Sequence, residues 1–514
     1  MLLIHPPVSK PCEPPAGIGK LCGVLNHHGI KHTVLDANLE GLLYLLTNSP
    51  PSSDTWTSRA FRHRSDHLGS LRSWSLYRNQ DRYKRAVKDI DHLLEVAGHS
   101  VGVRLGLANF EAQNLFPARI SDLLRAAETP ESNPFYPYFR GRLLDLLKEK
   151  HPSLVGFSLN YLSQALTTFA MIGFLRREYP GLTLVLGGGL VTSWIRRPTW
   201  QNPFNGLVDH LIPGPGERAL LSICEMKKMI QKENGHRSGE DHWMPGYASF
   251  PMEDYFSPGP ILPYSTSSGC YWNRCTFCPE RAEGNPYLPI PVERVISDLH
   301  VLVKKMNPIL IHLLDNTISP ALLKAISGNP PNVPWYGFAR ITHHLTDLDF
   351  CMALKKSGCV MLQLGLESGD QTVLDRMEKG INLSEASLAL KNLKKAGIAT
   401  YVYLLFGTPW ETRTEAQRTL EFIARHHDEI GFLNLAIFNL PVHSQESSLV
   451  ETESFYEGDL SLYTDFRHPQ GWGRKLVRQF LDKEFKRHPA IATILRRDPP
   501  VFTSNHAPLF VLSR

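Results

Sequence analysis

Short apolar runs alternate with amphipathic stretches in the N-terminal part of the chain. The runs predict strands at residues 2–4, 32–36, 154–158, 182–187 and 208–212, and the longest amphipathic stretches predict helices at 17–28 and 165–178. Strands that alternate with helices are typical of a parallel α/β sheet. Residues 45–150 interrupt this pattern with helical, aromatic-rich sequence, which we interpret as an inserted helical cover.

The alternation becomes regular after Pro263. Apolar runs predict strands at 264–267, 309–314, 335–339, 360–366, 400–406 and 432–438, with amphipathic helices between them. Six strand–helix units in succession predict a partial (β/α)6 barrel, an open version of the (β/α)8 barrel. The expected fold class is therefore α/β, with an N-terminal doubly wound parallel sheet followed by this barrel.

These patterns predict four segments. They are an α/β domain at 1–235 with the helical insertion at about 45–150, a linker at 236–262, a core domain at 263–445 and a C-terminal extension at 446–514. The linker is rich in Gly, Pro and acidic residues. The extension is charged and aromatic, and we expect it to close the open barrel, with His506 on the surface.

Composition excludes several classes of protein. The 514 residues are 42% hydrophobic and 20% charged, which is ordinary for globular domains. The net charge of +5 comes without a basic run, so nucleic-acid binding is not indicated. Eight cysteines in so long a chain fit a reducing cytoplasm. The N-terminal apolar run is too short for a signal peptide, and no stretch is long enough to span a bilayer.

Three cysteines, Cys270, Cys275 and Cys278, follow the first strand of the predicted barrel with the spacing C-x4-C-x2-C. Three thiolates on one loop can bind three corners of a cubane iron–sulfur cluster. The next cysteine is Cys351, far downstream, so no fourth thiolate follows nearby. The motif therefore predicts a cluster with one iron open to a small molecule.

A structural zinc site is the main alternative. Zinc usually takes four ligands, and Glu280, Glu283 or His300 could add a fourth to the three thiolates. The chain would then be a non-catalytic, zinc- or cluster-stabilised binding protein. A disulfide framework does not fit a chain with so few cysteines.

The motif resembles that of the radical S-adenosylmethionine (radical SAM) enzymes, in the branch with an N-terminal cobalamin-binding-like domain. The usual spacing there is C-x3-C-x2-C, so this chain has one extra residue, while Phe277 matches the aromatic position before the third cysteine. The resemblance implies a [4Fe–4S] cluster, reductive cleavage of S-adenosylmethionine to a 5′-deoxyadenosyl radical, and a reductant such as flavodoxin or ferredoxin.

Polar residues and turn motifs recur where successive barrel strands end. Each could be a helix cap or a surface residue, but their recurrence favours a shared cavity, because the active sites of such barrels lie at the carboxyl ends of the strands. The resemblance implies that Arg340 contacts the methionine carboxylate and Asp315 its amino group. It further implies that Glu367 contacts the ribose or the amino group, and that Gly407 and Pro409 lie beside the adenine.

A second set of residues marks strand ends in the N-terminal domain. Ser158, Gly187 and Gly188 resemble the strand-end serine and Gly-Gly pair of the cobalamin-binding domain. The Asp-x-His-x-x-Gly motif that supplies a cobalt ligand in some members is absent. Bound cobalamin would make methyl transfer or an oxidative rearrangement plausible, on a small-molecule or peptide substrate that the sequence does not identify. A domain that binds nothing, or that serves as a scaffold for a cobalamin-independent enzyme, is the alternative.

Overall fold

The computed structural model describes residues 1–48, 54–197, 200–227, 229, 242–442, 444–453 and 458–513. Contacts divide the chain into two compact units. The first comprises Met1–Leu76, Asp81–Gly259 and a short segment ending at Ser461, and the second comprises Tyr77–Gln80 and most of the chain after Pro260. Each unit is built on a parallel sheet, which confirms the predicted α/β class.

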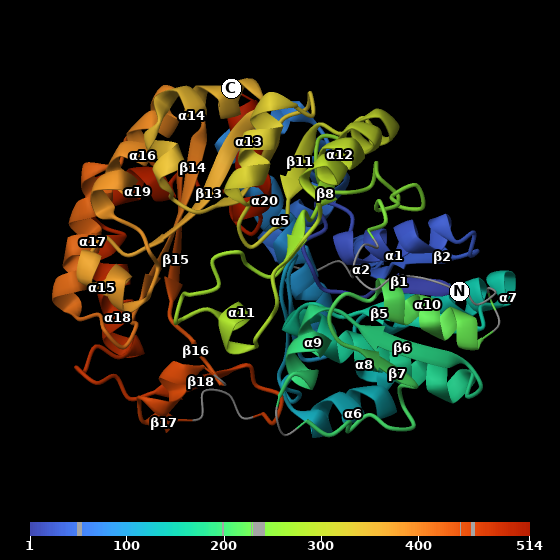
Figure 1. Ribbon diagram of the computed structural model, residues 1–514. Helices are drawn as coiled ribbons and strands as arrows, with labels where there is room; N and C mark the ends of the chain where they lie inside the picture. Colours follow the sequence, from blue (N-terminus) through green and yellow to red (C-terminus); the bar gives the residue numbers. More distant parts are fainter. Residues whose placement is uncertain are drawn as a thin grey trace. The chain divides into compact units, whose positions relative to one another are not determined.

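The described strands of the first unit form a parallel sheet in the order β2-β1-β5-β6-β7. Their bounds are Leu2–His5 (β1), Thr33–Asp36 (β2), Leu154–Ser158 (β5), Thr183–Gly187 (β6) and His210–Ile212 (β7) (Figure 1). From β1 the chain first adds β2 on one side of this strand, and it later adds β5, β6 and β7 on the other side. In an open sheet of this order, ligands bind beyond the carboxyl ends of the strands at the point of reversal.

Helices cover this sheet, and further helices form the predicted insertion. Their bounds are Ala16–His27 (α1), Ala37–Asn48 (α2), Thr55–Leu71 (α3), Trp74–Tyr77 (α4), Gln80–His99 (α5), Ile120–Glu128 (α6), Tyr136–Lys150 (α7), Leu162–Glu178 (α8), Gly189–Ile195 (α9) and Glu217–Met226 (α10). The insertion also contains a hairpin, β3 (Val103–Leu105) with β4 (Phe110–Ala112), which the helical pattern did not predict.

Residues 242–259, expected to be part of a linker, pack within the first unit. The Tyr255 hydroxyl donates to the Asp36 carboxylate at 2.7 Å, and both side chains are buried. The ring of Tyr247 lies against Gly19, where an added Cβ would come within 2.4 Å of it. The boundary between the two units falls between Gly259 and Pro260. Residues 236–241 lie outside the described chain.

The described strands of the second unit form a parallel sheet in the order β15-β14-β13-β12-β11-β8, so neighbours follow one another along the chain. Their bounds are Ile261–Tyr264 (β8), Leu310–Leu313 (β11), Trp335–Ala339 (β12), Cys359–Glu367 (β13), Ala399–Phe406 (β14) and Phe432–Ile437 (β15). β8 and β15 stand at the two edges of this sheet, as an open barrel requires.

The first barrel strand begins earlier than the sequence pattern predicted. It was expected at 264–267, after Pro263, but β8 covers Ile261–Tyr264 and includes that proline. Proline is tolerated because β8 is an edge strand, where its missing N–H breaks no ladder hydrogen bond. Residues after Tyr264 are thereby released into the loop that carries the cysteines.

Several helices of the second unit begin at a side chain that caps the first turn. Ser319 caps α13 ahead of Pro320, and Thr412 with Glu415 forms a capping box on α17. The bounds are Pro279–Ala282 (α11), Val292–Met306 (α12), Pro320–Gly328 (α13), Leu348–Lys356 (α14), Gln371–Arg376 (α15), Leu383–Lys395 (α16), Arg413–Arg425 (α17), Arg474–Phe480 (α18), Pro489–Leu495 (α19) and Thr503–Leu512 (α20).

The C-terminal extension packs on the barrel strands. Its helix α20 contacts β13, and the hydroxyls of Tyr401 and Tyr403 on β14 lie against Thr503 and Ser504. His506 is fully buried and stacks on Phe502, with ring centroids 4.2 Å apart. The expectation of a surface histidine was wrong, because the aromatic residues of the extension enclose its ring. β16 (Leu440–Pro441), β17 (Thr452–Glu453) and β18 (Tyr463–Phe466) form a small additional sheet.

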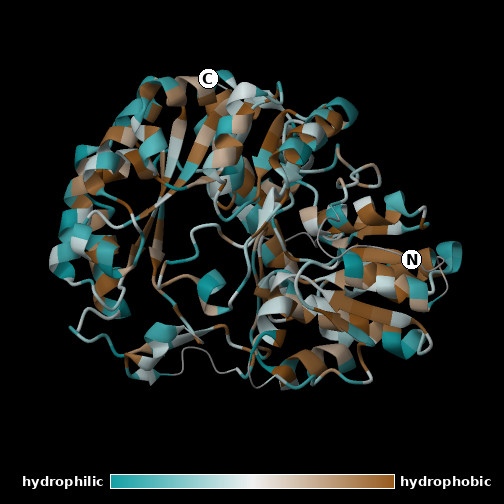
Figure 2. Ribbon diagram, viewed as in Figure 1, coloured by the Kyte–Doolittle hydropathy of each residue, from teal (hydrophilic) through white to brown (hydrophobic). Residues whose placement is uncertain are grey.

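Hydrophobic residues concentrate in the strands of both sheets, and hydrophilic residues lie on the outer faces of many covering helices (Figure 2). Among the described residues, no helix combines the length and apolar character needed to cross a bilayer.

Candidate active site

The three cysteines lie in the loop of a hairpin that follows β8. β9 (Ser267–Ser268) pairs antiparallel with β10 (Leu288–Pro289) and closes this loop. Gly269, just before the first cysteine, has φ of +74°, and an added Cβ would lie 2.3 Å from the carbonyl oxygen of Pro286. Glycine is therefore required where the chain enters the cysteine loop.

The thiols are at least partly buried, and polar groups oppose the cost of ionising two of them. Burial raises the pKa of Cys278 to about 11, while the backbone N–H groups of Glu280 and Arg281 favour its thiolate. Burial likewise raises the pKa of Cys275, and the positive charges of Lys379 and Arg340 counteract this. These contacts suit thiolates that bind a positively charged metal centre.

Zinc and a cubane cluster require different arrangements of the three thiolates. Within the described chain, no three or more His, Cys, Asp or Glu side chains gather around one point as ligands of a single ion would. A zinc ion needs its sulfur ligands about 2.3 Å from one centre. A cubane cluster takes one thiolate at each of three irons and so spreads them apart. The three thiols on one loop, with the positive charges of Lys379 and Arg340 beside Cys275, have the donor chemistry that a cubane cluster needs.

Arg340 follows β12 and is 7% exposed. Its Nη2 donates to the carbonyl oxygens of Lys379 and Gly380, at 2.6 and 3.3 Å. The guanidinium carbon lies 3.9 Å from the ring centroid of Trp272, and the group also interacts with the Cys275 thiol. The predicted carboxylate-binding residue thus lies beside the cysteines and already has partners within the protein.

Glu367 ends β13 with φ of +68°, a conformation that costs energy for a residue with a side chain. Its Oε1 accepts from the Nζ of Lys379 at 2.8 Å, and the two side chains are only 13% and 9% exposed. The same Nζ lies 5.4 Å from the ring centroid of Phe277. Lys379 therefore links the end of β13 to the cysteine loop.

Asp315 comes shortly after β11 and is 2% exposed. Its carboxylate accepts from the backbone N–H and hydroxyl of Thr266, the latter at 2.8 Å, and from the hydroxyl of Ser267 at 2.6 Å. The residue predicted to contact the methionine amino group thus anchors the start of the cysteine hairpin.

Gly407 and Pro409 lie in a buried turn after β14. Gly407 has φ of +80°, and its N–H donates to Oε2 of Glu411, which also accepts from the indole N–H of Trp472 at 3.2 Å. Among the described residues Oε1 of Glu411 has no hydrogen-bond partner. Burial raises the pKa of this carboxyl to about 8, so it is mainly protonated at neutral pH.

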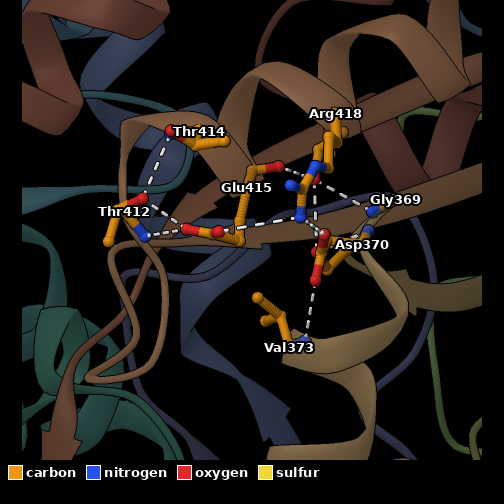
Figure 3. A network of polar contacts seen from close by, with 9 residues as sticks. Gly369, Asp370, Val373, Thr412, Thr414, Glu415 and Arg418 are labelled. Carbon is orange, nitrogen blue, oxygen red and sulfur yellow. Dashed lines mark hydrogen bonds and ion pairs between the residues drawn. The ribbon is translucent and has the colours of Figure 1, made fainter.

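A polar network joins the turns after β13 and β14 (Figure 3). Asp370 caps α15 through the N–H of Val373 and accepts from Arg418 of α17 at 2.7 Å, while Arg418 also lies near Glu415. Glu415 in turn accepts from the N–H and hydroxyl of Thr412. The two turns that carry Glu367 and Gly407 are therefore held at fixed positions.

The predicted cobalamin-binding residues meet at the carboxyl edge of the first unit's sheet. Ser158 ends β5 and pairs with Gly187 of β6, and its hydroxyl accepts from the side-chain amide of Asn160 at 3.1 Å. The Oδ1 of Asn160 accepts from the N–H of Gly189 at 3.0 Å. Gly188 has φ of +113°, and an added Cβ would lie 2.3 Å from the Leu159 carbonyl oxygen. The edge thus presents neutral polar groups and exposed backbone.

Comparison with known proteins identifies the second unit's core. Residues 264–423 match the radical SAM superfamily. This segment is a radical SAM domain. Enzymes with this domain use a [4Fe–4S] cluster and S-adenosylmethionine.

Two curated proteins are similar to this chain. Each is 25% identical to it over a segment that makes up 54% of this chain. One is an uncharacterized methyltransferase of Pyrococcus horikoshii, with 65% of its length covered. The other is the anaerobic magnesium-protoporphyrin IX monomethyl ester cyclase of Cereibacter sphaeroides, with 50% covered. The chain therefore spans less than two thirds of the length of either relative.

The fold resembles that of the radical SAM methyltransferase TsrM from Kitasatospora setae, solved with cobalamin and a [4Fe–4S] cluster bound. The TM-score is 0.51 at 16% identity, over 86% of this chain and 75% of the other. This likeness concerns the fold and extends beyond the radical SAM domain.

Three residues beside the cysteines escaped the sequence analysis: Trp272, Lys379 and Gly380. Trp272 lies in the longer spacer between the first two cysteines, and that extra length was the available signal. Lys379 and Gly380 lie after α15, far from the motif in sequence, and no pattern marks them. Only the fold brings them to the loop.

Proposed function

We propose that this radical SAM protein binds a [4Fe–4S] cluster through Cys270, Cys275 and Cys278 and cleaves S-adenosylmethionine reductively. When bound and reduced, such a cluster supplies the electron that breaks a carbon–sulfur bond of the sulfonium and gives the 5′-deoxyadenosyl radical. The observation that carries the proposal is the cysteine loop, which lies within the radical SAM domain beside two buried cations, Arg340 and Lys379.

The strand-end residues would hold S-adenosylmethionine. We assign Phe277, Asp315, Arg340, Glu367, Gly407 and Pro409 to this site. Arg340 is buried and the Glu367 side chain is 13% exposed, both on the cysteine side of β12 and β13, and Glu367 keeps one oxygen outside its bond to Lys379. Charged groups with fixed partners are pre-oriented for a zwitterionic ligand, because little reorganisation is needed on binding. Asp315 would act mainly by fixing the hairpin.

We further propose that residues 1–235 form a cobalamin-binding domain, with Ser158, Gly187 and Gly188 at its site, and that the reaction is methyl transfer. The similarity to an uncharacterized methyltransferase supports this assignment, as does a fold like that of a cobalamin-bound enzyme. Glycine backbone at a strand edge admits a large ligand closely. On this view residues 263–445 are the catalytic domain, 446–514 extend the core, and 236–262 connect the two domains, with 242–259 packed on the first of them. The enzyme would act in the cytoplasm with a flavodoxin- or ferredoxin-like reductant.

The test is anaerobic purification followed by iron, sulfide and zinc analysis, then addition of S-adenosylmethionine and dithionite. We expect about four irons per chain and formation of 5′-deoxyadenosine, with both lost in Cys275→Ala. Cys359→Ala is the matched control, because Cys359 is buried at the start of β13, at the opposite end of that strand from Glu367. Stoichiometric zinc without S-adenosylmethionine cleavage would instead establish the zinc-stabilised binding protein.

A further inference from the structure

The four consecutive backbone carbonyls of Met377–Gly380 accept hydrogen bonds from the cysteine loop and from the arginine beside it. The first accepts from the N–H of Thr276 at 3.0 Å, and the second from the indole N–H of Trp272 at 3.1 Å. The last two accept from Nη2 of Arg340. A short stretch of main chain thus binds the cysteine loop at two points and also binds the arginine beside it.

Side chains reinforce this contact. Gly380 has φ of +64°, and an added Cβ would lie 2.3 Å from the ring of Trp272. The guanidinium of Arg340 also lies over that ring. Arg281, just after the last cysteine, pairs with the Glu378 carboxylate at 3.0 Å. The indole therefore packs where only a glycine leaves room for it.

Trp272 belongs to the spacer in which this chain has one residue more than usual for its family. The next residue, Asn273, turns the chain in the left-handed conformation, with φ of +43°. The longer spacer thus carries the indole to the Met377–Gly380 segment. The segment contacts the loop through main-chain carbonyls, which every residue type carries. The side chains of the segment therefore gave no signal in the sequence.

We propose that Met377–Gly380 is a positioning segment that holds the lengthened cysteine loop in the form that binds the cluster, with Trp272 as the matching contact. The proposal rests on the proposed function in that the loop carries a cluster. The segment takes no part in the chemistry. It orders the loop before the cluster arrives and slows the departure of iron afterwards.

Two substitutions test the contact. Gly380→Ala places a methyl group against the indole. Gly397→Ala is its control, because Gly397 has a similar φ of +73° but only ordinary contacts with Lys355. Trp272→Phe keeps an aromatic ring and removes the N–H that binds the segment, so it tests the hydrogen bond without a new side chain at a left-handed position.

The first measurement is hydrogen exchange in the cluster-free protein, followed at the amide of Thr276. We expect about tenfold faster exchange in Gly380→Ala and Trp272→Phe, and wild-type exchange at this amide in Gly397→Ala. The second is the rate at which a chelator removes iron from the reconstituted protein. We expect faster removal from Gly380→Ala and Trp272→Phe than from the wild type and Gly397→Ala. Thermal unfolding of all variants checks that the fold persists.

Equal exchange at Thr276 in Gly380→Ala and Gly397→Ala, or wild-type exchange in Trp272→Phe, would overturn the proposal. Because exchange is measured without a cluster, this result is independent of the proposed function. A chain that shows the expected exchange but binds no iron would keep the segment as an ordering contact of the loop and reject the cluster.

Discussion

The carboxyl edges of the two parallel sheets are built from different chemistry. In the second unit the edge holds buried charges with fixed partners, such as Glu367 with Lys379 and Asp315 with the hydroxyls of two neighbouring residues. In the first unit the part of the edge formed by β5 and β6 presents the Ser158 hydroxyl, the Asn160 amide and glycine backbone, while the Asp36 carboxyl lies two strands away at the end of β2. The strand ends thus carry charged side chains around the cysteines of the second unit and neutral groups at β5 and β6 of the first.

The difference indicates what each edge can bind. Buried charges cost desolvation energy, and they are retained where they orient a charged ligand or metal centre. Neutral polar groups and glycines cost little, and they suit a bulky ligand held by shape and many weak contacts. This contrast agrees with the two proposed sites, for a zwitterionic sulfonium beside an iron–sulfur cluster at the second unit's edge and for a large macrocycle at the first unit's edge.

Removing the cation of the buried pair should cause the largest loss of stability of any single substitution considered. Lys379→Met leaves the Glu367 carboxylate buried without its partner, which should destabilise the protein by about 3 kcal/mol. Urea unfolding measures this loss, and Lys356→Met, at an exposed site on α14, is the control. Adding Glu367→Gln to Lys379→Met should restore most of the stability. Equal losses in Lys379→Met and Lys356→Met would remove the contrast between the two edges.

Glu411 is an exception among the acidic groups at the second unit's strand ends, because burial keeps its carboxyl neutral. Its folded pKa of about 8 lies above the ordinary 4.5, so the folded state holds a proton that the unfolded state releases. Between these values stability should fall as pH rises, by about 1.4 kcal/mol per pH unit. Unfolding of the wild type and Glu411→Gln across this range isolates the contribution, since the glutamine oxygen can still accept both hydrogen bonds. Parallel pH profiles would show that the group is ionised in the fold.

Periodicity predicted much of this fold. The bounds of β5 and β12 agree with the sequence pattern to the residue, since each is a short and mainly apolar run. β8 was misplaced because Pro263 read as a boundary, and only the sheet order shows that it lies on an edge. Local rules do not contain that information.

The site was predictable where it follows strand ends and unpredictable where the chain folds back. Arg340 and Glu367 could be found because parallel strands bring their carboxyl ends to one edge. Their partners could not: Lys379 lies on a loop whose contact with the cysteines depends on the path of the chain after α15. A lysine in a polar loop is expected to be exposed to solvent, yet the side chain of Lys379 is only 9% exposed.

The glycine turn of the first unit should be sensitive to a single methyl group. Gly188→Ala combines an unfavourable φ with a close approach to the Leu159 carbonyl, and we expect a loss of about 2 kcal/mol. Gly181→Ala is the matched control, because its added Cβ meets nothing within 4 Å. Thermal unfolding and cobalamin titration of both variants measure the effect. A Gly188→Ala protein as stable as Gly181→Ala would contradict the tight turn on which the neutral edge depends.

The smallest expected effect is that of Ser158→Ala, and it probes the neutral edge directly. The change removes one acceptor of the Asn160 amide, which should cost about 1 kcal/mol of stability. Asn160 would still accept from the N–H of Gly189, so the turn should persist. If the hydroxyl also contacts cobalamin, the affinity measured by titration should fall about fivefold, as for a single hydrogen bond between neutral groups. Asn160→Asp would add a charge at the same place. A neutral edge should tolerate that charge far less than the loss of the hydroxyl, and an equal response to the two changes would show that shape alone decides binding there.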